Sequence, residues 1–137
     1  MVFTYGSLMC HDIMSRVCGE SVQGEAARLA DYARHPLRGE TYPGLVAFPG
    51  GQVTGRLYHL LDESRVLSRL DAFEGEMYAR HRVCVNPVGG GQVEAWCYIL
   101  EQVYCDLLLP GDWDFATFLA SGKADFEARY LGFLALD

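Results

Sequence analysis

The chain opens on Val2-Phe3-Thr4-Tyr5-Gly6-Ser7-Leu8, an apolar run that soon meets a glycine. This pattern predicts a strand over residues 2–5 that Gly6 breaks. Because glycine lets the backbone turn sharply, consecutive N–H groups after it can face one concavity, which suits a carboxylate or a developing oxyanion. The hydroxyl groups of Tyr5 and Ser7 are further candidate donors. An ordinary strand-to-helix turn would leave the same pattern, since glycine turns after strands are common.

A second informative segment is Leu70-Asp71-Ala72-Phe73-Glu74-Gly75. It ends a stretch in which apolar residues recur at helical spacing, and this stripe consists of Val66, Leu67, Leu70 and Phe73. Asp62 is a suitable N-cap for the helix, and Gly75 fits the position that ends a helix in left-handed geometry. The pattern therefore predicts a helix that carries Glu74 at its C-terminal end, just ahead of a strand.

Glu74 is the candidate acid/base of this segment. The negative end of the helix dipole, the neighbouring Asp71 and an apolar lining by Phe73 and Tyr78 would all raise the pKa of its carboxyl. A raised pKa is what a proton shuttle near neutral pH needs. The alternative is an ordinary solvated glutamate, which is common near helix ends. Asp71 and Glu76 are the other candidates; we interpret Asp71 as structural, with a carboxyl bonded to the loop backbone, and Glu76 as a surface residue.

The remaining pattern is rich in strands. Residues 24–32 have helical propensity, but their alternation and flanking glycines favour a strand. We also expect strands over residues 78–86 and 92–100, and a hairpin of residues 45–48 and 53–60 across the turn-forming Pro49-Gly50-Gly51-Gln52. Tyr42-Pro43-Gly44 is predicted to form a turn whose aromatic ring walls a pocket, and Gly55 indicates either a bulge or a close backbone approach. Short helices are expected over residues 12–17 and 124–134. A further short helix is expected to begin after an N-cap at Asp112 or Asp114 and to end at Leu119. The expected fold is α+β: a single domain over residues 1–137, built as a small mixed β-barrel of about five to seven strands with flanking helices.

Composition excludes several classes of function. The net charge is −7, which disfavours nucleic acid and anionic membrane surfaces as partners. No apolar run approaches a membrane span, and the first residues do not resemble a signal peptide. The five cysteines lack CxxC spacing and are expected to be free thiols in a reducing cytoplasm, with Cys84 and Cys97 as small core residues. The four histidines form no metal-binding pair, so no metal site is expected.

The motifs together resemble the γ-glutamylcyclotransferase superfamily, in its AIG2-like or γ-glutamylamine cyclotransferase type. The resemblance rests on motifs that follow in order over most of residues 1–100: residues 2–8, Tyr42-Pro43-Gly44, Gly55-Arg56-Leu57-Tyr58, residues 70–75, Tyr78-Ala79-Arg80 and Ala95-Trp96-Cys97-Tyr98. The segment after Tyr104 matches nothing that we can place.

The resemblance implies a small β-barrel with flanking helices and a γ-glutamyl substrate held by the loop Tyr5, Gly6, Ser7 and Leu8, with Tyr42 and Tyr78 close by. It implies that Glu74 acts as general acid/base in an intramolecular cyclisation, which releases 5-oxoproline and an amine. No metal or redox cofactor is needed, because the nucleophile is already tethered to the reacting carbonyl. The leaving amine and the oligomeric state are left open.

Two rival functions remain at this point. The same fold can hold a γ-glutamyl-like ligand or a protein partner without chemistry. A cysteine hydrolase that uses Cys10 or Cys18 with His11 or His35 is the other rival, although no orienting Asn or Asp is evident.

Overall fold

The computed structural model describes residues 1–136. Over these residues five strands close into a barrel in the order β1-β3-β2-β4-β5. The strands are β1 (Val2–Thr4), β2 (Gln23–Pro36), β3 (Pro43–His59), β4 (Tyr78–Pro87) and β5 (Val93–Leu100). Strand β1 pairs antiparallel with β3 and parallel with β5, so the sheet is mixed. The expected small mixed barrel with flanking helices is confirmed.

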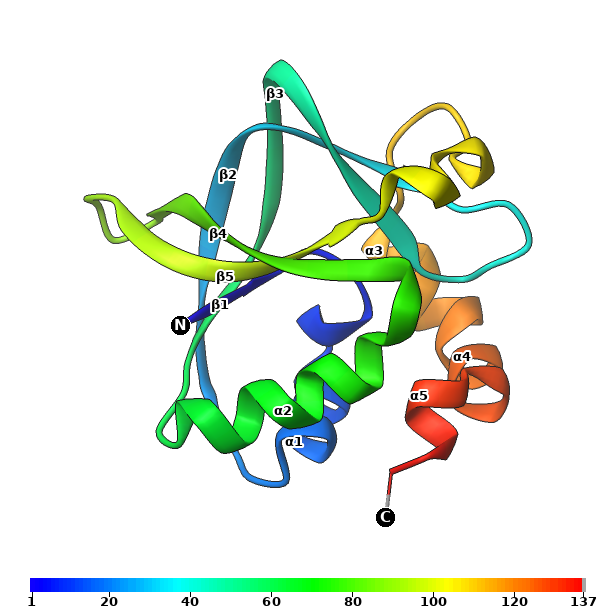
Figure 1. The fold of residues 1–137 in the computed structure, drawn as a ribbon, viewed down its shortest axis with the longest axis horizontal. Helices are drawn as coiled ribbons and strands as arrows, with labels where there is room; N and C mark the ends of the chain where they lie inside the picture. Colours follow the sequence, from blue (N-terminus) through cyan, green and yellow to red (C-terminus); the bar gives the residue numbers. More distant parts are fainter. Residues whose placement is uncertain (137) are drawn as a thin grey trace.

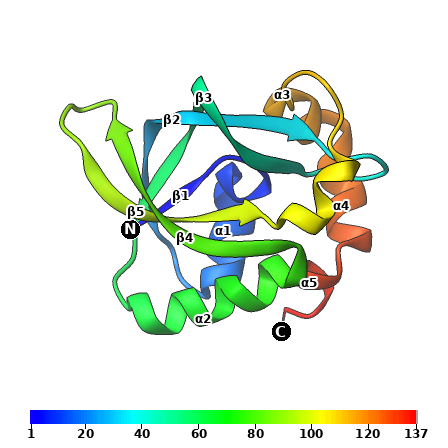
Figure 2. The same cartoon turned by 45° about the horizontal axis from the view of Figure 1, so that its top comes forward.

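Helices cover the outside of this barrel. Helices α1 (His11–Cys18) and α2 (Glu63–Glu74) pack on each other beneath it, as Figures 1 and 2 show. The chain after β5 forms a 3-10 helix (Gln102–Leu107) and then the short helices α3 (Phe115–Thr117), α4 (Lys123–Arg129) and α5 (Leu131–Leu134). A π-helical turn (Phe118–Gly122) joins α3 to α4, and α5 lies against α2. Within residues 1–136, no helix is both long and apolar enough to cross a membrane.

Alternation along the strands divides the apolar residues into two clusters. Phe3, Leu57 and Cys97 belong to the cluster inside the barrel. Their chain neighbours, among them Val2 and Tyr58, belong to the cluster between barrel and helices. This is the two-residue period of a strand. The same period corrects the expectation for Cys84, which is exposed because Val83 and Val85 on either side of it point inward.

The predicted hairpin between residues 45 and 60 is wrong. Both halves belong to one strand, β3, and both pair antiparallel with the long β2. The segment Pro49–Gln52 lies where the register shifts opposite Asp31, whose carboxylate accepts a hydrogen bond from the Gly50 N–H over 3.0 Å. The turn-forming residues therefore bend a continuous strand, as in a large β-bulge, and do not reverse it. Pro43 and Gly44, which were predicted to form a turn with Tyr42, are the first residues of β3.

Helix α2 follows its predicted signals closely. The Asp62 side chain caps it by accepting a bond from the Arg65 N–H, and Val66, Leu67, Leu70 and Phe73 form its buried face. Gly75 ends it with a φ of 74°, but its ψ of −160° differs from the expected left-handed geometry. The chain then makes one 3-10 turn, Gly75–Met77, and enters β4. Glu74 is therefore fixed where the helix meets the barrel.

Gly55 lies where β1 crosses closest to β3. A Cβ placed on it would sit 2.1 Å from the Thr4 carbonyl oxygen and 2.7 Å from the Phe3 ring. The expected close backbone approach is confirmed, and it sets the position of the loop that follows β1.

We predict that Gly55→Ala lowers the free energy of unfolding by about 2 kcal/mol or more, because the backbone of β1 has to move to admit the methyl group. Equilibrium urea unfolding measures this. Gly89→Ala is the matched control, since its Cβ would meet only the Glu25 carboxylate at 3.9 Å, and we expect a change within about 0.5 kcal/mol. Equal stability of Gly55→Ala and the wild type would contradict the close approach.

Candidate active site

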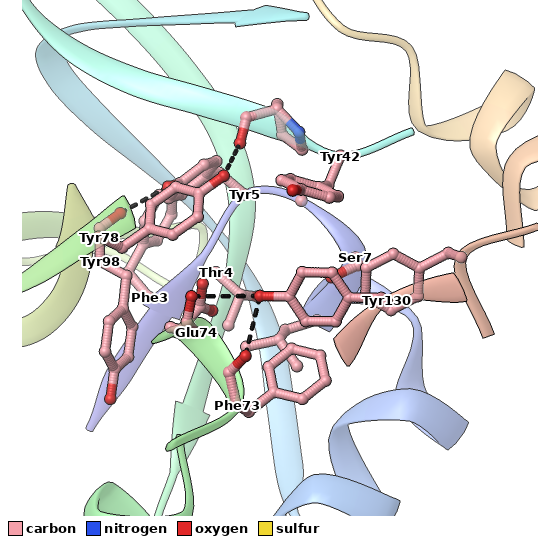
Figure 3. A pocket seen from close by; sticks show the side chains of 14 residues that line it. Phe3, Thr4, Tyr5, Ser7, Tyr42, Phe73, Glu74, Tyr78, Tyr98 and Tyr130 are labelled. Atoms are coloured by element: carbon pink, nitrogen blue, oxygen red, sulfur yellow. Dashed lines mark hydrogen bonds between the residues drawn. The ribbon is translucent and has the colours of Figure 1, made fainter. Parts of the chain in front are cut away.

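A small cavity opens between the loop after β1, the end of α2 and the chain after α3. Its volume is about 30 Å³, and one water needs about 10–15 Å³ on this measure. All seven residues singled out from the sequence line it: Tyr5, Gly6, Ser7, Leu8, Tyr42, Glu74 and Tyr78. Figure 3 shows the labelled side chains of this set around one space. Residues that are distant in sequence thus converge on a single cavity.

The carboxyl of Glu74 has no partner in this cavity. Among residues 1–136 no hydrogen bond or ion pair reaches its oxygens, although Glu74 as a whole keeps some exposed surface. Burial is the main cause that raises its pKa to about 8, and the charge of Asp71 adds to it. A carboxyl with this pKa is mostly protonated at pH 7 and exchanges its proton readily just above it.

Asp71 is structural, but not in the expected way. Its carboxylate forms two bonds to the Arg80 guanidinium, at 3.0 and 3.2 Å, and does not bond the loop backbone. It also accepts a bond from the Tyr98 hydroxyl over 2.6 Å. Arg80 in turn lies 4.6 Å from the centre of the Trp96 ring. Asp71 therefore ties α2 to strands β4 and β5 and places Glu74 at the barrel.

The loop after β1 leaves three consecutive N–H groups free. It forms a 3-10 helix over Ser7–Met9, in which the N–H groups of Met9 and Cys10 bond the carbonyls of Gly6 and Ser7. Over the described chain, the N–H groups of Gly6, Ser7 and Leu8 have no acceptor, and these residues line the cavity. They are the donors available to an anion or an oxyanion.

Two side chains from the barrel hold this loop by its carbonyl groups. The Arg34 guanidinium donates to the Tyr5 carbonyl over 2.8 Å, and the Tyr58 hydroxyl donates to the Leu8 carbonyl over 3.0 Å. In a planar trans peptide the N–H points opposite to the C=O, so Arg34 aims the Gly6 N–H away from itself. Arg34 is held in turn by Asp112 at 2.8 and 3.0 Å. Neither role was expected from the sequence: Arg34 belongs to no motif, and Tyr58 was noted only as part of the motif Gly55-Arg56-Leu57-Tyr58.

The tyrosine hydroxyls of the cavity are mostly engaged elsewhere. Tyr5 donates to the Tyr98 carbonyl at 2.5 Å, and Tyr78 donates to the Pro43 carbonyl at 2.6 Å. Burial raises the pKa of both phenols well above the usual value, so they stay neutral. The suggestion that Tyr5 offers its phenolic hydrogen to a ligand is therefore disfavoured, and Tyr5 and Tyr78 act as walls. Tyr42 is also a wall, and its hydroxyl lies 3.8 Å from the Met77 sulfur.

The cavity also contains residues that the sequence analysis did not assign to it. They are Phe3, Thr4, Pro43, Tyr98, Phe126 and Tyr130. Phe126 and Tyr130 come from the C-terminal segment that matched no motif. Their four-residue spacing indicates that they share one face of a helix, but it does not indicate which part of the protein that face contacts.

The geometry disfavours the rival cysteine hydrolase. Cys10 and Cys18 are buried, and burial raises the pKa of both thiols, to about 11 for Cys18. Nucleophilic cysteines need the opposite shift. The Nδ1 atom of His35 is engaged with the Gly111 carbonyl oxygen at 2.8 Å. Within residues 1–136, no three His, Cys, Asp or Glu side chains gather as metal ligands.

Comparison with known proteins places these features in a family. Residues 2–115 match the family model described as Gamma-glutamyl cyclotransferase, AIG2-like. AIG2-like protein D of Arabidopsis thaliana is 34% identical over 117 residues, which cover 83% of this chain and 75% of that protein.

Solved structures of other proteins have a similar fold. A solution structure of an Arabidopsis thaliana protein has a TM-score of 0.69 and 26% identity, covering 93% of this chain and 85% of that one. A structure titled gamma-glutamyl cyclotransferase shares the fold, with a TM-score of 0.61 at 19% identity over 73% of this chain and 65% of its own. The chain therefore belongs to the AIG2-like gamma-glutamyl cyclotransferase family.

Proposed function

We propose that the protein catalyses the intramolecular cyclisation of a γ-glutamyl amide, with Glu74 as the general acid/base. The observation that carries this proposal is the unpaired carboxyl of Glu74, whose pKa is about 8, in the same cavity as the free N–H groups of Gly6, Ser7 and Leu8. Family membership supports the reaction class.

The reaction needs no water and no external nucleophile. The α-amine nitrogen of the substrate attacks its own γ-carbonyl carbon, and the bond between that carbon and the amide nitrogen breaks. The products are 5-oxoproline and a free amine. Because the nucleophile is tethered, holding the chain folded supplies much of the acceleration, with effective molarities of about 10⁵ M or more in good geometries.

One carboxyl can carry the proton through this reaction. The attacking amine, with a reference pKa near 8, must lose a proton, and the departing nitrogen must gain one. Ionised Glu74 takes the proton from the first nitrogen and returns it to the second. A pKa of about 8 suits both transfers, since the carboxyl is neither a permanent base nor a permanent acid near neutrality.

The loop N–H groups would steady the negative charge that develops on the carbonyl oxygen. A well-aimed donor of this kind contributes roughly 3 kcal/mol to the transition state. The carbonyl bonds from Arg34 and Tyr58 hold the loop before substrate binds, so little reorganisation is needed.

Substrate binding requires movement at the cavity wall. A glutamyl group is larger than the space of about 30 Å³, which holds about two waters. A second cavity of about 490 Å³ adjoins it, and the two share Tyr42, Phe73, Glu74, Phe126 and Tyr130 as lining residues. We infer that these shared residues yield to the substrate and that the amine end extends into the larger cavity.

We predict that Glu74→Gln lowers turnover by about 10²–10⁴-fold, because the amide has the same shape but cannot shuttle a proton. The assay incubates the purified protein with a panel of γ-glutamyl amino acids, γ-glutamyl-lysine and glutathione and measures 5-oxoproline by mass spectrometry. Glu101→Gln, which changes an exposed carboxylate outside the cavity, is the control and should keep full activity. Turnover by the Glu74→Gln protein would eliminate Glu74 as the shuttle.

The same assay separates the enzyme from the binding module. An enzyme releases 5-oxoproline at a rate that rises with pH through about 8, as Glu74 loses its proton. Saturable binding of these compounds without release of 5-oxoproline from any of them would support the binding module instead.

The pKa of Glu74 also predicts how stability depends on pH. Between the reference pKa of 4.5 and about 8 the unfolded chain ionises Glu74 while the folded protein keeps it neutral, so folding loses stability as pH rises through this window. Above the window both states are ionised, and the folded protein carries the full penalty.

We therefore expect Glu74→Gln to melt at a higher temperature than the wild type at pH 9, with the difference shrinking at pH 5. Differential scanning calorimetry at the two pH values measures it, with Glu101→Gln as the reference. A difference that is independent of pH would show that Glu74 titrates normally in the folded protein.

A further inference from the structure

Tyr130 lies between α4 and α5, beyond residues 2–115 that match the family model. Its side chain nevertheless reaches the candidate active site and lines both cavities. Figure 3 shows its ring directed toward Glu74, with its hydroxyl at the end of α2. The C-terminal segment thus contributes to the site.

The Tyr130 hydroxyl bonds the backbone on which Glu74 stands. It lies 2.8 Å from the Phe73 carbonyl oxygen and 3.2 Å from the Glu74 carbonyl oxygen. One hydroxyl hydrogen serves both acceptors, and the shorter contact is the main bond. The last carbonyls of a helix have no partner inside the helix, so this hydroxyl satisfies groups that would otherwise need water.

The backbone of α5 approaches the same helix end. A Cβ placed on Gly132 would lie 2.1 Å from the Phe73 carbonyl oxygen, so glycine is needed for this contact. The Phe73 carbonyl is thus held between Gly132 and the Tyr130 hydroxyl. These contacts hold the backbone from which the Glu74 side chain extends.

The Tyr130 ring closes the wall beside the carboxyl. It stacks on Phe126 with 4.6 Å between ring centres, and it lies 5.1 Å from the rings of both Tyr42 and Phe73. These aromatic rings stand where the small cavity meets the larger one. Since Glu74 lines both cavities, removing the Tyr130 ring would widen the opening between them and admit more water to the carboxyl.

Among residues 1–136 no cation forms an ion pair with Glu74, although Arg129 lines the larger cavity with it, together with the acidic Glu40, Glu76 and Asp125. The ionisable groups that influence Glu74, or that it influences, are Tyr5 just after β1, Tyr42 before β3, Asp71 on α2, Tyr78 on β4, Cys97 and Tyr98 on β5, and Tyr130 itself. Of these only Asp71 is charged near neutral pH, and it is paired with Arg80. Exclusion of water by the surrounding rings is therefore the property of the site that a change at Tyr130 would alter most.

We propose that Tyr130 is a positioning residue for Glu74: its hydroxyl holds the end of α2, and its ring keeps water from the carboxyl. The catalytic consequence rests on the proposed function, but the effect on the Glu74 carboxyl does not. Tyr130 contacts the backbone of the acid/base and acts through it.

The test is a direct titration of the Glu74 carboxyl. Protein labelled with ¹³C at the glutamate side-chain carboxyl is followed by NMR from pH 4 to pH 10, and Glu74→Gln assigns the signal. The wild type should titrate with a midpoint of about 8. Tyr130→Phe keeps the ring and should move the midpoint by less than about half a unit, whereas Tyr130→Ala should lower it by about one unit or more.

Tyr32→Phe is the matched control, because it removes a tyrosine hydroxyl from β2, outside both cavities, and should leave the midpoint unchanged. If circular dichroism shows that Tyr130→Ala does not fold, Tyr130→Leu replaces it and should lower the midpoint by a smaller step. A folded Ala or Leu variant with the wild-type midpoint would overturn the shielding role, and so would a wild-type midpoint near 4.5.

Turnover tests the role of the hydroxyl. With the γ-glutamyl compound that the wild type converts best, Tyr130→Phe should lower kcat about tenfold with little change in KM, because a displaced carboxyl harms the chemical step more than binding. Unchanged kcat in this variant would overturn the role of the hydroxyl. If the wild type releases no 5-oxoproline, the proposed function fails, while the titration still decides whether Tyr130 controls Glu74.

Discussion

The site depends on the burial of one carboxyl without a cation to pair with it. A buried acid of this kind costs stability, because water solvates the charged form better than protein does. The cavity that Glu74 lines has aromatic rings from three strands, from two loops, from α2 and from the C-terminal segment, and the negative charge of Asp71 raises the pKa of Glu74 further. The guanidinium of Arg80 pairs with the carboxylate of Asp71 and not with that of Glu74. The result is a carboxyl that gains or loses a proton near neutral pH.

Hydrogen bonds between the barrel and the helices hold the elements around this carboxyl in place. Asp71 ties α2 to β4 and β5, and the tyrosine hydroxyls join neighbouring elements through backbone carbonyls. Since these hydroxyls are engaged, the free N–H groups of Gly6, Ser7 and Leu8 become the main donors left in the cavity. A carboxyl and a set of free N–H groups thus line one cavity, which is the arrangement that the proposed intramolecular acyl transfer needs.

Much of this arrangement could be predicted from the sequence, because it depends on local patterns of residues. The stripe of α2, its Asp62 cap and Gly75 set the position of Glu74, and Gly6 marked the loop that faces it. The hairpin across Pro49–Gln52 failed because a second, long strand paired with both halves, and local turn chemistry does not report such a partner. Arg34, Tyr58 and Tyr130 were missed for a related reason: each acts on a backbone carbonyl far away in the chain. Patterns of residue type do not record bonds to the backbone.

A crystal structure with a non-cyclisable γ-glutamyl analogue tests the central claim most directly. The account predicts that the carbonyl oxygen of the analogue accepts bonds from the N–H groups of Gly6 to Leu8, while a carboxyl oxygen of Glu74 lies within hydrogen-bond reach of the α-amine position. An analogue bound elsewhere, or a Glu74 carboxyl turned into open solvent in the complex, would contradict it.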